Sequence, residues 1–284
     1  MTRNGKVISF INMKGGVGKT TLCVGIGEYL ASYLDKKVLF IDVDPQFNTT
    51  QSLMDYFNQA EQYMNDYRHN KNIRKLFESV TSISERPRLP ELEEVIVSFP
   101  DSNIDLIPGN IDLIFDDNQS DNAKSRRIKK FINVHKLREK YDFIFIDCPP
   151  TISFYTDAAL NASDYYLVPN RIDRYSILGI KLLKQVIDRL AYDEELKIEP
   201  LGIVYTMVGV GTPSQKTQRL RETFESASIV QEIEIFTSET STVNDLMVGL
   251  RGNIASVYKR SREDIAQITD ELLDRLQRRG NNES

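Results

Sequence analysis

Short runs of apolar residues recur along the chain and alternate with longer segments of helical spacing. The runs are Val7–Ile11, Val38–Val43, Ile104–Ile107, Phe143–Ile146, Tyr165–Val168, Leu201–Tyr205 and Ile233–Phe236. They are continuously apolar instead of alternating with polar residues, which is typical of strands that are buried on both faces. The pattern therefore predicts an α/β fold in which a mainly parallel, twisted sheet carries helices on both faces.

The chain is expected to form one domain over residues 1–284. Residues 48–103 are less regular and mostly helical in tendency, which predicts an insertion with a loop near residues 85–90. Residues 262–279 predict a C-terminal helix, and its apolar face carries Ile265, Ile268, Leu272, Leu273 and Leu276. This helix has five acidic residues and no aromatic anchor, so we expect it to pack on the core of the domain and not on a membrane surface.

Basic residues are concentrated in three places. Residues 124–140 contain eight Lys or Arg and one acid, and they predict a helix that packs through Ile128, Phe131 and Ile132. We interpret the basic side of this helix as solvated, and the alternative is an anion-binding stripe. The smaller clusters are Lys216, Arg219 and Arg221, and Arg251, Lys259, Arg260 and Arg262.

Composition limits the partners and the compartment. Because the net charge is −5, any contact with nucleic acid must come from a local basic patch. The two cysteines, Cys23 and Cys148, lie far apart without paired spacing, which favours reduced thiols over a disulfide or a metal site. No apolar run reaches membrane-spanning length, and we expect a cytoplasmic protein.

A glycine-rich turn joins the first expected strand to the following helix, with the sequence Lys14-Gly15-Gly16-Val17-Gly18-Lys19-Thr20-Thr21. Glycines allow backbone N–H groups to turn toward an anion, and the helix N-terminus adds positive potential there. Lys19 can neutralise terminal phosphates, and the Thr20 hydroxyl can bind Mg²⁺. The turn departs from the usual phosphate-loop spacing, since Met13 replaces the first glycine and Lys14 is an additional lysine.

Three acidic residues follow buried strands. Asp42 and Asp44 stand two residues apart at the end of the second strand, and Asp147 follows the strand over 143–146. Since ligands of parallel sheets bind at the carboxyl ends of the strands, we expect these acids beside the glycine-rich turn. Mg²⁺ takes few carboxylates and keeps several waters. One acid can therefore hold a metal-bound water while another orients an attacking water for in-line displacement.

Taken in order, the segments KGGVGKTT, IDVDPQ and FIFIDCPP resemble the ParA/MinD group of P-loop ATPases, and specifically its ParA branch. That group has a deviant Walker A motif with a signature lysine before the glycine pair, and it tolerates a non-glycine residue at the position of Met13. Weaker matches over 106–109, 167–169 and 243–249 extend the resemblance over most of the chain. The resemblance implies a three-layer P-loop NTPase fold, with ATP and Mg²⁺ as cofactors.

The resemblance also implies roles for single residues. Lys14 would be the signature lysine, which reaches the nucleotide of a partner subunit, and Lys19 the P-loop lysine. Asp44 would be the switch-I aspartate needed for hydrolysis, and Asp147 the Walker B acid. The metal set implied is Thr20, Asp42, Asp44 and Asp147. The nucleotide-binding set implied is Lys14, Gly15, Gly16, Val17, Gly18, Lys19, Thr20, Thr21, Asn48 and Met207, with Met207 at the adenine.

The function implied is that of a weak, partner-stimulated ATPase in DNA partition. Such a protein would form an ATP-dependent homodimer, bind DNA non-specifically and be released by a ParB-like activator. It would be nucleoid-associated in the ATP state, and no membrane contact is expected. The alternative is a MinD-like positioning ATPase that acts on a membrane or a protein assembly. Two other classes are disfavoured. A metal-cluster carrier would need paired cysteines, and a bacterial tyrosine kinase would need a C-terminal tyrosine cluster; the sequence has neither feature.

The sequence departs from the family pattern in three places. Phe47 replaces the glycine of the family's DPQGN segment, which predicts a stiffer switch I. The family's proline-arginine element after the last strand is replaced by Ile235-Phe236-Thr237-Ser238. The first strand begins at residue 7, so we expect no DNA-binding domain before the glycine-rich turn and no operator-specific repression.

Overall fold

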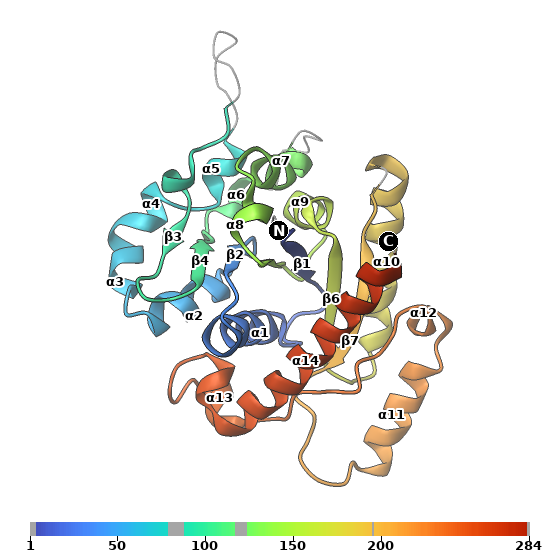
Figure 1. Ribbon diagram of the computed structural model, residues 1–284. Coiled ribbons are helices and arrows are strands. Elements are labelled where there is room, and N and C mark those ends of the chain that lie inside the picture. Colours follow the sequence, from blue (N-terminus) through green and yellow to red (C-terminus); the bar gives the residue numbers. More distant parts are fainter. Residues whose placement is uncertain (1–3, 79–87, 117–123, 195, 283–284) are drawn as a thin grey trace.

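The computed structural model of the chain describes residues 4–78, 88–116, 124–194 and 196–282. Within these ranges the centre is a seven-stranded sheet in the order β3-β4-β2-β5-β1-β6-β7 (Figure 1). The strands are β1 (Lys6–Phe10), β2 (Val38–Asp42), β3 (Val97–Ser98), β4 (Ile104–Ile107), β5 (Phe143–Asp147), β6 (Tyr165–Asn170) and β7 (Glu199–Tyr205). The neighbouring pairs are parallel except β3 with β4, which confirms the predicted mainly parallel sheet.

Helices fill the connections between the strands. The longer ones are α1 (Lys19–Leu34), α2 (Asn48–Tyr56), α7 (Arg127–Val134), α9 (Phe154–Ala162), α10 (Ser176–Glu194), α11 (Gln215–Glu225) and α14 (Lys259–Asn282). The short ones are α3 (Ala60–Gln62), the π-helical η1 (Tyr63–Tyr67), α4 (Arg68–Asn70), α5 (Arg74–Phe77), η2 (Leu92–Glu94), α6 (Leu113–Asp116), η3 (Lys124–Arg126), α8 (Leu137–Lys140), α12 (Ser228–Gln231), α13 (Asn244–Met247) and η4 (Ala255–Val257). Part of the loop expected near residues 85–90 lies outside the described residues.

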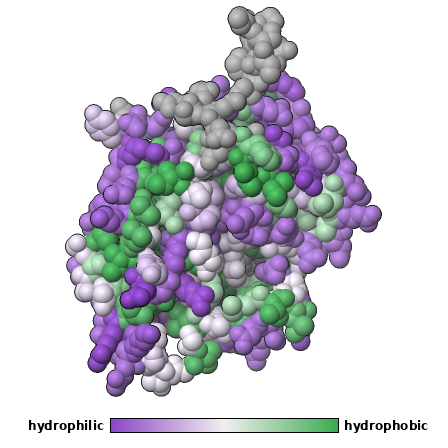
Figure 2. Space-filling view, turned by 180° about the vertical axis from the view of Figure 1, so that it is seen from behind, coloured by the Kyte–Doolittle hydropathy of each residue, from purple (hydrophilic) through white to green (hydrophobic). Residues whose placement is uncertain are grey.

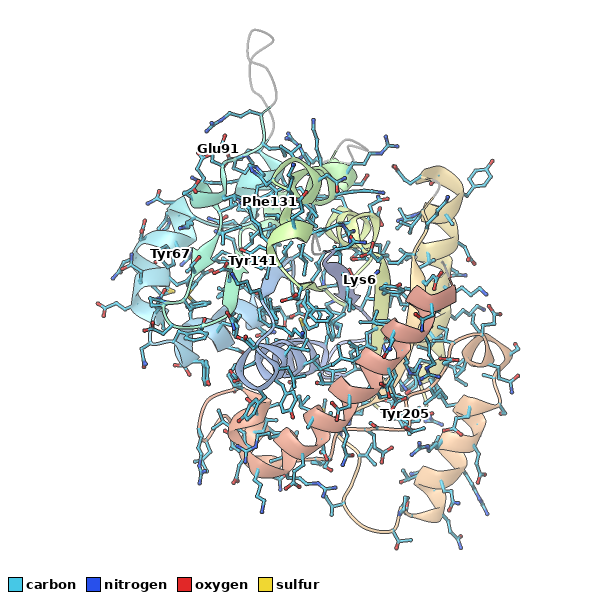
Figure 3. All side chains as sticks on the ribbon, in the orientation of Figure 1. Lys6, Tyr67, Glu91, Phe131, Tyr141 and Tyr205 are labelled. Atoms are coloured by element: carbon cyan, nitrogen blue, oxygen red, sulfur yellow. The ribbon has the colours of Figure 1, made fainter. Side chains whose placement is uncertain are left out.

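The sheet separates two hydrophobic cores, because neighbouring residues of a strand point to opposite faces. On one face Val7 of β1 belongs to a core with Phe131 of α7, which Figure 3 labels. On the other face Ile8 packs with Ile26 of α1 and Ile268 of α14. A strand that enters both cores must be apolar at every position, which explains the continuous apolar runs. The result is the predicted arrangement of three layers (Figure 1).

The apolar face of α14 is buried against α1 and the sheet. Ile265, Ile268, Leu272 and Leu276 are all part of the core on that side, and Leu273 packs at its edge. The helix therefore covers the core of its own chain, and its apolar face is not presented to a membrane. Among the described helices, none combines the length and the apolarity that a bilayer crossing requires.

The strand predicted over Ile233–Phe236 is not formed, and that prediction is wrong. The segment makes an isolated parallel bridge to β7 at Ile235. Beyond it, the N–H groups of Thr237 and Ser238 donate to the carboxylate of Glu271 on α14. The segment therefore bridges β7 at one residue and is tied to α14 directly afterwards.

The single helix predicted over 124–140 is also wrong. The structure has η3, α7 and α8, and the last two are separated at Lys136, whose φ is 51°. The ring of His135 packs on Phe131 and makes a hydrogen bond of 3.0 Å with the carbonyl of Pro90, which fixes the break. The predicted packing residues Ile128, Phe131 and Ile132 are nevertheless buried. Strand β3 was not predicted, since its two residues are too few to show a pattern.

Helix α1 approaches the sheet so closely that Gly27 leaves no space for a side chain. A Cβ atom there would lie 2.2 Å from Cζ of Phe40 and 3.2 Å from Cδ2 of Phe145. We expect Gly27→Ala to lower the free energy of unfolding by about 1–3 kcal/mol, because the added methyl group must displace packed rings. Urea unfolding measures this value.

Gly280→Ala is the matched control, because nothing lies within 4 Å of a Cβ at Gly280 on α14. We expect its free energy of unfolding to stay within about 0.5 kcal/mol of the wild-type value. Equal unfolding midpoints for Gly27→Ala and the wild type would contradict the close packing of α1.

Candidate functional site

The glycine-rich turn lies at the carboxyl end of β1 and leads into α1. Gly16 and Gly18 have φ values of 69° and 81°, in the left-handed region that residues with a Cβ atom avoid. Gly18 is the N-cap of α1 and supplies no side chain to cap the helix. The first N–H groups of α1 therefore lack side-chain capping at this position and are available to an anion.

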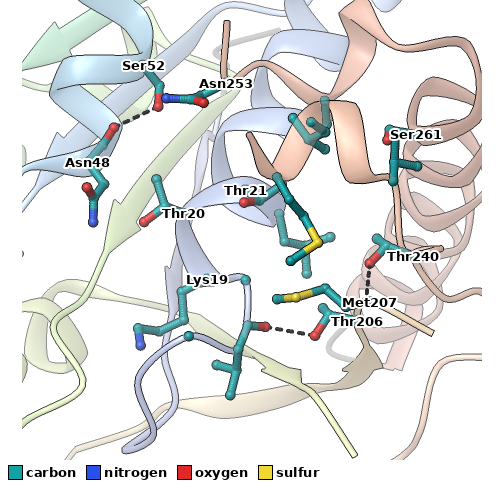
Figure 4. Close-up of a pocket in the computed structure, with 18 of the residues that line it drawn as sticks. Lys19, Thr20, Thr21, Asn48, Ser52, Thr206, Met207, Thr240, Asn253 and Ser261 are labelled. Atoms are coloured by element: carbon teal, nitrogen blue, oxygen red, sulfur yellow. Dashed lines mark hydrogen bonds between the residues drawn. The ribbon is translucent and has the colours of Figure 1, made fainter. Parts of the chain in front are cut away.

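A pocket of about 450 Å³ opens over this turn, which is within the range of small-molecule sites. Asn48 and Ser52 of α2 line one side, and Thr206, Met207 and Thr240 line the other, with Lys19 and Thr20 between them (Figure 4). In the view from behind, hydrophobic residues form separate patches around a hollow where residues of intermediate hydropathy lie (Figure 2). The pocket lies at the carboxyl edge of the sheet, where ligands of parallel sheets bind.

Lys19 is the buried cation of the site. Its ammonium group donates to the carbonyl oxygen of Lys14 at 3.1 Å. Burial lowers the pKa of Lys19, and the negative charges of Asp147 and Asp44 oppose that effect. An anionic ligand above the turn would further stabilise the charged form of this lysine.

Asp147 at the end of β5 connects the turn to α2. Its Oδ2 accepts hydrogen bonds from the hydroxyls of Thr20 at 2.6 Å and Thr49 at 2.8 Å. Its Oδ1 is buried and has no hydrogen-bond partner among the described residues. Burial raises the pKa of this carboxyl to about 6, against the effect of the two threonine hydrogen bonds. Thr20 and the unpartnered oxygen together provide a place for a hydrated Mg²⁺ ion.

Within the described part of the chain, no three acidic, histidine or cysteine side chains converge as a complete metal cage. The Thr20 hydroxyl and the Asp147 carboxylate, whose Oδ1 is unpartnered among the described residues, fit Mg²⁺, which takes few protein ligands and keeps several waters.

The two acids after β2 have different surroundings. Asp44 lines the pocket, and its Oδ1 accepts the Gln46 N–H at 2.9 Å, while burial raises its pKa. Asp42 is fully buried, and its Oδ2 accepts both the N–H and the hydroxyl of Thr50, at 2.8 and 2.7 Å. Burial, and then the charge of Asp147, raise the pKa of Asp42 well above its usual range. Asp42 thus anchors the start of α2, and its place in the metal set stays a prediction.

Lys14, the lysine before the glycine pair, has a partner outside the glycine-rich turn. Its ammonium group forms an ion pair with the carboxylate of Asp173, in the connection between β6 and α10. The pocket lining along the turn begins at Gly15. Lys14 is therefore held at the same edge of the sheet as the pocket, but by an acid that the sequence analysis did not single out.

Met207 lines the pocket, and its contact with adenine stays a prediction. Its φ is 53°, its N–H donates to the Thr240 hydroxyl at 3.1 Å, and its carbonyl accepts from the Thr242 hydroxyl at 2.8 Å. Its Cε would lie 3.3 Å from a Cβ atom at Gly18, so the side chain packs directly on the turn. The pocket thus has a thioether beside its phosphate-binding end.

Sequence reasoning missed most of the C-terminal wall of the pocket. The missed lining residues there are Thr240, Ser241, Met247, Asn253, Ala255 and Ser261. They come from an irregular segment without apolar periodicity, and only the weak match at Val243 and Leu246 pointed to it. Thr49, the second hydroxyl on Asp147, was missed because a threonine after a proline-containing turn has no distinctive pattern.

Comparisons with known proteins agree with this geometry. The model of a family described as an AAA domain matches residues 5–199. The sporulation initiation inhibitor protein Soj of Bacillus subtilis is 32% identical over 211 residues, covering 73% of this chain and 75% of Soj. A virulence plasmid ParA family protein of Chlamydia psittaci is 27% identical over 277 residues, covering 95% of each chain.

A crystal structure of a plasmid partition protein from Borrelia burgdorferi superimposes with a TM-score of 0.69 at 21% identity. The match covers 96% of this chain and 99% of that one, and at this identity it shows a common fold. The family match and the similarity to Soj show more than the fold, because they extend over most of the chain. The glycine-rich turn with its preceding lysine, the strand-end acids and these matches together place the chain in the ParA/MinD-type family of P-loop ATPases.

Proposed function

We propose that this protein is a DNA-partition ATPase that works as an ATP-dependent homodimer. The observation that carries the proposal is the position of Lys14 at the rim of a complete phosphate-binding turn, paired with Asp173 and not with its own pocket. A lysine at this place can add positive charge to the phosphates bound by a second subunit, as an arginine finger does.

Within one subunit, the N–H groups of residues 15–21 and the ammonium group of Lys19 bind the phosphates of ATP. Thr20 and a water on the unpartnered oxygen of Asp147 would hold Mg²⁺, which would supply positive charge to the phosphates. Asp44 would orient the attacking water. Asn48 and Met207 line opposite sides of the pocket and would contact the nucleotide there.

The face around the pocket supports the proposal of a homodimer. Large apolar side chains are exposed along this edge: Ile152 after β5 is 52% exposed, and Tyr175 and Leu178 after β6 are 62% and 53% exposed. Met247, which lines the pocket, and Val248 beside it are 58% and 77% exposed. Closing two such faces together would bury these side chains and bring each Lys14 near the other subunit's nucleotide.

The basic residues differ in how far they are free to bind DNA. In the segment 124–140, Arg126 pairs with Glu194 and Arg138 pairs with Asp164, so this cluster is neutralised in part. Arg221 pairs with Glu225 and Glu239, and Arg260 pairs with Asp264. In contrast, Lys216, Arg219, Arg251 and Lys259 are exposed and make no ion pair within the described residues. These four cations support contact with phosphates of DNA.

The homodimer proposal predicts the outcome of Lys14→Ala. We expect steady-state ATP turnover to fall about tenfold or more, because the charge supplied across the dimer is lost. Affinity of the monomer for ATP should change less than about twofold, because the pocket of the same subunit is intact. Turnover measured by phosphate release, with affinity measured by calorimetry, separates the two effects.

Lys19→Ala is the comparison for this experiment. It should lower the affinity for ATP as well as turnover, since Lys19 lies inside the pocket. If Lys14→Ala hydrolyses ATP at the wild-type rate, Lys14 does not act across a dimer.

The DNA proposal predicts retention on random-sequence duplex DNA with ATP and Mg²⁺, decreasing steeply as salt is added. The triple charge reversal Lys216→Glu, Arg219→Glu and Arg251→Glu should abolish retention at about 0.15 M salt. Lys129→Glu with Lys130→Glu on α7 is the comparison, because both side chains are exposed but belong to a separate basic cluster. An equal loss of retention in this variant would show that the effect depends on net charge and not on Lys216, Arg219 and Arg251. Surface plasmon resonance on immobilised DNA measures each protein. No retention of the wild type even at low salt would exclude the partition function.

A further inference from the structure

Phe47 has a backbone conformation that an aromatic residue rarely adopts. Its φ and ψ are 43° and 38°, in the left-handed region. A side chain with a Cβ atom is strained there, and such strain persists only where the surrounding structure holds it in place. This position lies between Asp44 and Asn48, two residues that line the nucleotide pocket.

Packing around the ring explains how the conformation is held. The ring of Phe47 lies 5.8 Å from the ring of Tyr63, centroid to centroid, and the two planes are inclined by 34°. Tyr63 is buried in η1, and its hydroxyl donates to the carbonyl of Gly109 at 3.0 Å. A Cβ at Gly109 would lie 2.9 Å from Cβ of Phe47, so the absence of a side chain at Gly109 makes room for Phe47.

The same residue holds the turn that carries Asp44. The N–H of Phe47 donates to the carbonyl of Asp44 at 2.8 Å, and the carbonyl of Phe47 accepts the N–H of Gln51 at 2.9 Å. Phe47 is the N-cap residue of α2, whose Thr49 and Thr50 hydroxyls bond to Asp147 and Asp42. A shift of Phe47 would therefore move Asp44 relative to the acids of β2 and β5.

We propose that Phe47 and Tyr63 form an aromatic clamp, in which Phe47 is a positioning residue that holds Asp44 in its geometry for hydrolysis before nucleotide binds. The proposal rests on the role of Asp44 proposed above. A turn that is already ordered does not lose conformational freedom when the nucleotide arrives, and its carboxylate is in place at the moment of reaction. In this proposal the residues between β2 and β4 have a function, because they place Tyr63 beside the turn that contains Asp44 and Phe47.

Substitutions at Phe47 have a distinctive expected order. Phe47→Ala keeps the Cβ atom that makes the left-handed conformation unfavourable but removes the ring that holds it, so the turn relaxes to another conformation. Phe47→Gly removes both the ring and the strain, so the native turn remains accessible but is mobile. Phe47→Tyr keeps the ring. We expect kcat for ATP to fall about tenfold in Phe47→Ala and about threefold in Phe47→Gly, and to be restored in Phe47→Tyr.

Two further measurements separate positioning from loss of stability. KM for ATP should change less than about twofold in all three variants, because the phosphate-binding turn is untouched. Amide hydrogen exchange at residues 46–51 should become faster in Phe47→Ala and in Tyr63→Ala, which removes the other half of the clamp. The double variant Phe47→Ala with Tyr63→Ala should turn over ATP no more slowly than either single variant, because each single variant already removes the same ring contact.

Phe57→Ala is the matched control. Phe57 stacks on Phe99 at 4.2 Å, in the same part of the chain, whereas the ring of Phe47 pairs with Tyr63. Its loss should lower stability without changing kcat. Equal kcat losses in Phe57→Ala and Phe47→Ala, or wild-type kcat and exchange in Phe47→Ala, would overturn the clamp.

Asp44→Asn distinguishes the clamp from the proposed function. An inactive Asp44→Asn together with a wild-type Phe47→Ala would reject the clamp alone. Wild-type turnover in Asp44→Asn would instead reject the assignment of Asp44 to hydrolysis.

Discussion

The close approach of α1 to the sheet is the constraint on which the site depends. Gly27 lets the helix lie against Phe40 and Phe145, and α14 covers its other side through Ile265, whose Cδ1 would lie 2.9 Å from a Cβ at Gly25. With α1 fixed from both sides, its N-terminus is held at the carboxyl end of β1. The left-handed glycines of the turn then direct free N–H groups into the pocket, so an anion-binding site results from packing as much as from the motif.

The second feature is the burial of three carboxyl groups at the ends of β2 and β5. Burial raises the pKa of Asp42, Asp44 and Asp147. Desolvation of this kind is unfavourable unless hydrogen bonds or cations compensate. Threonine hydroxyls and N–H groups from the start of α2 satisfy several of the oxygens, and Lys19 provides a cation. The oxygen that stays without a partner, Oδ1 of Asp147, is the one best suited to a metal-bound water.

Much of this could be predicted from the chain alone. Six of the seven predicted strands exist, because strands buried on both faces are continuously apolar. The phosphate-binding turn and the acids beside it could also be predicted, because their chemistry depends on a few neighbouring residues. The segment 233–236 makes one bridge to β7, and Glu271, more than thirty residues away in the sequence, holds the two residues that follow it. The helix over 124–140 is interrupted at Lys136, whose φ is 51°, where the neighbouring His135 bonds to the distant Pro90 carbonyl.

The sequence by itself determined the parallel sheet, the order of its motifs and the glycine-rich turn with the acids beside it. Those features follow from local periodicity, from glycine at required backbone conformations and from the carboxyl ends of strands meeting at one edge. Only the tertiary structure decided that Asp42 anchors α2, that Lys14 pairs with Asp173 and that Phe47 packs on Tyr63. Each of these contacts joins residues from different elements, so no local pattern records it. The tertiary structure also decided which basic residues make no ion pair, because ion pairing depends on neighbours that folding brings together.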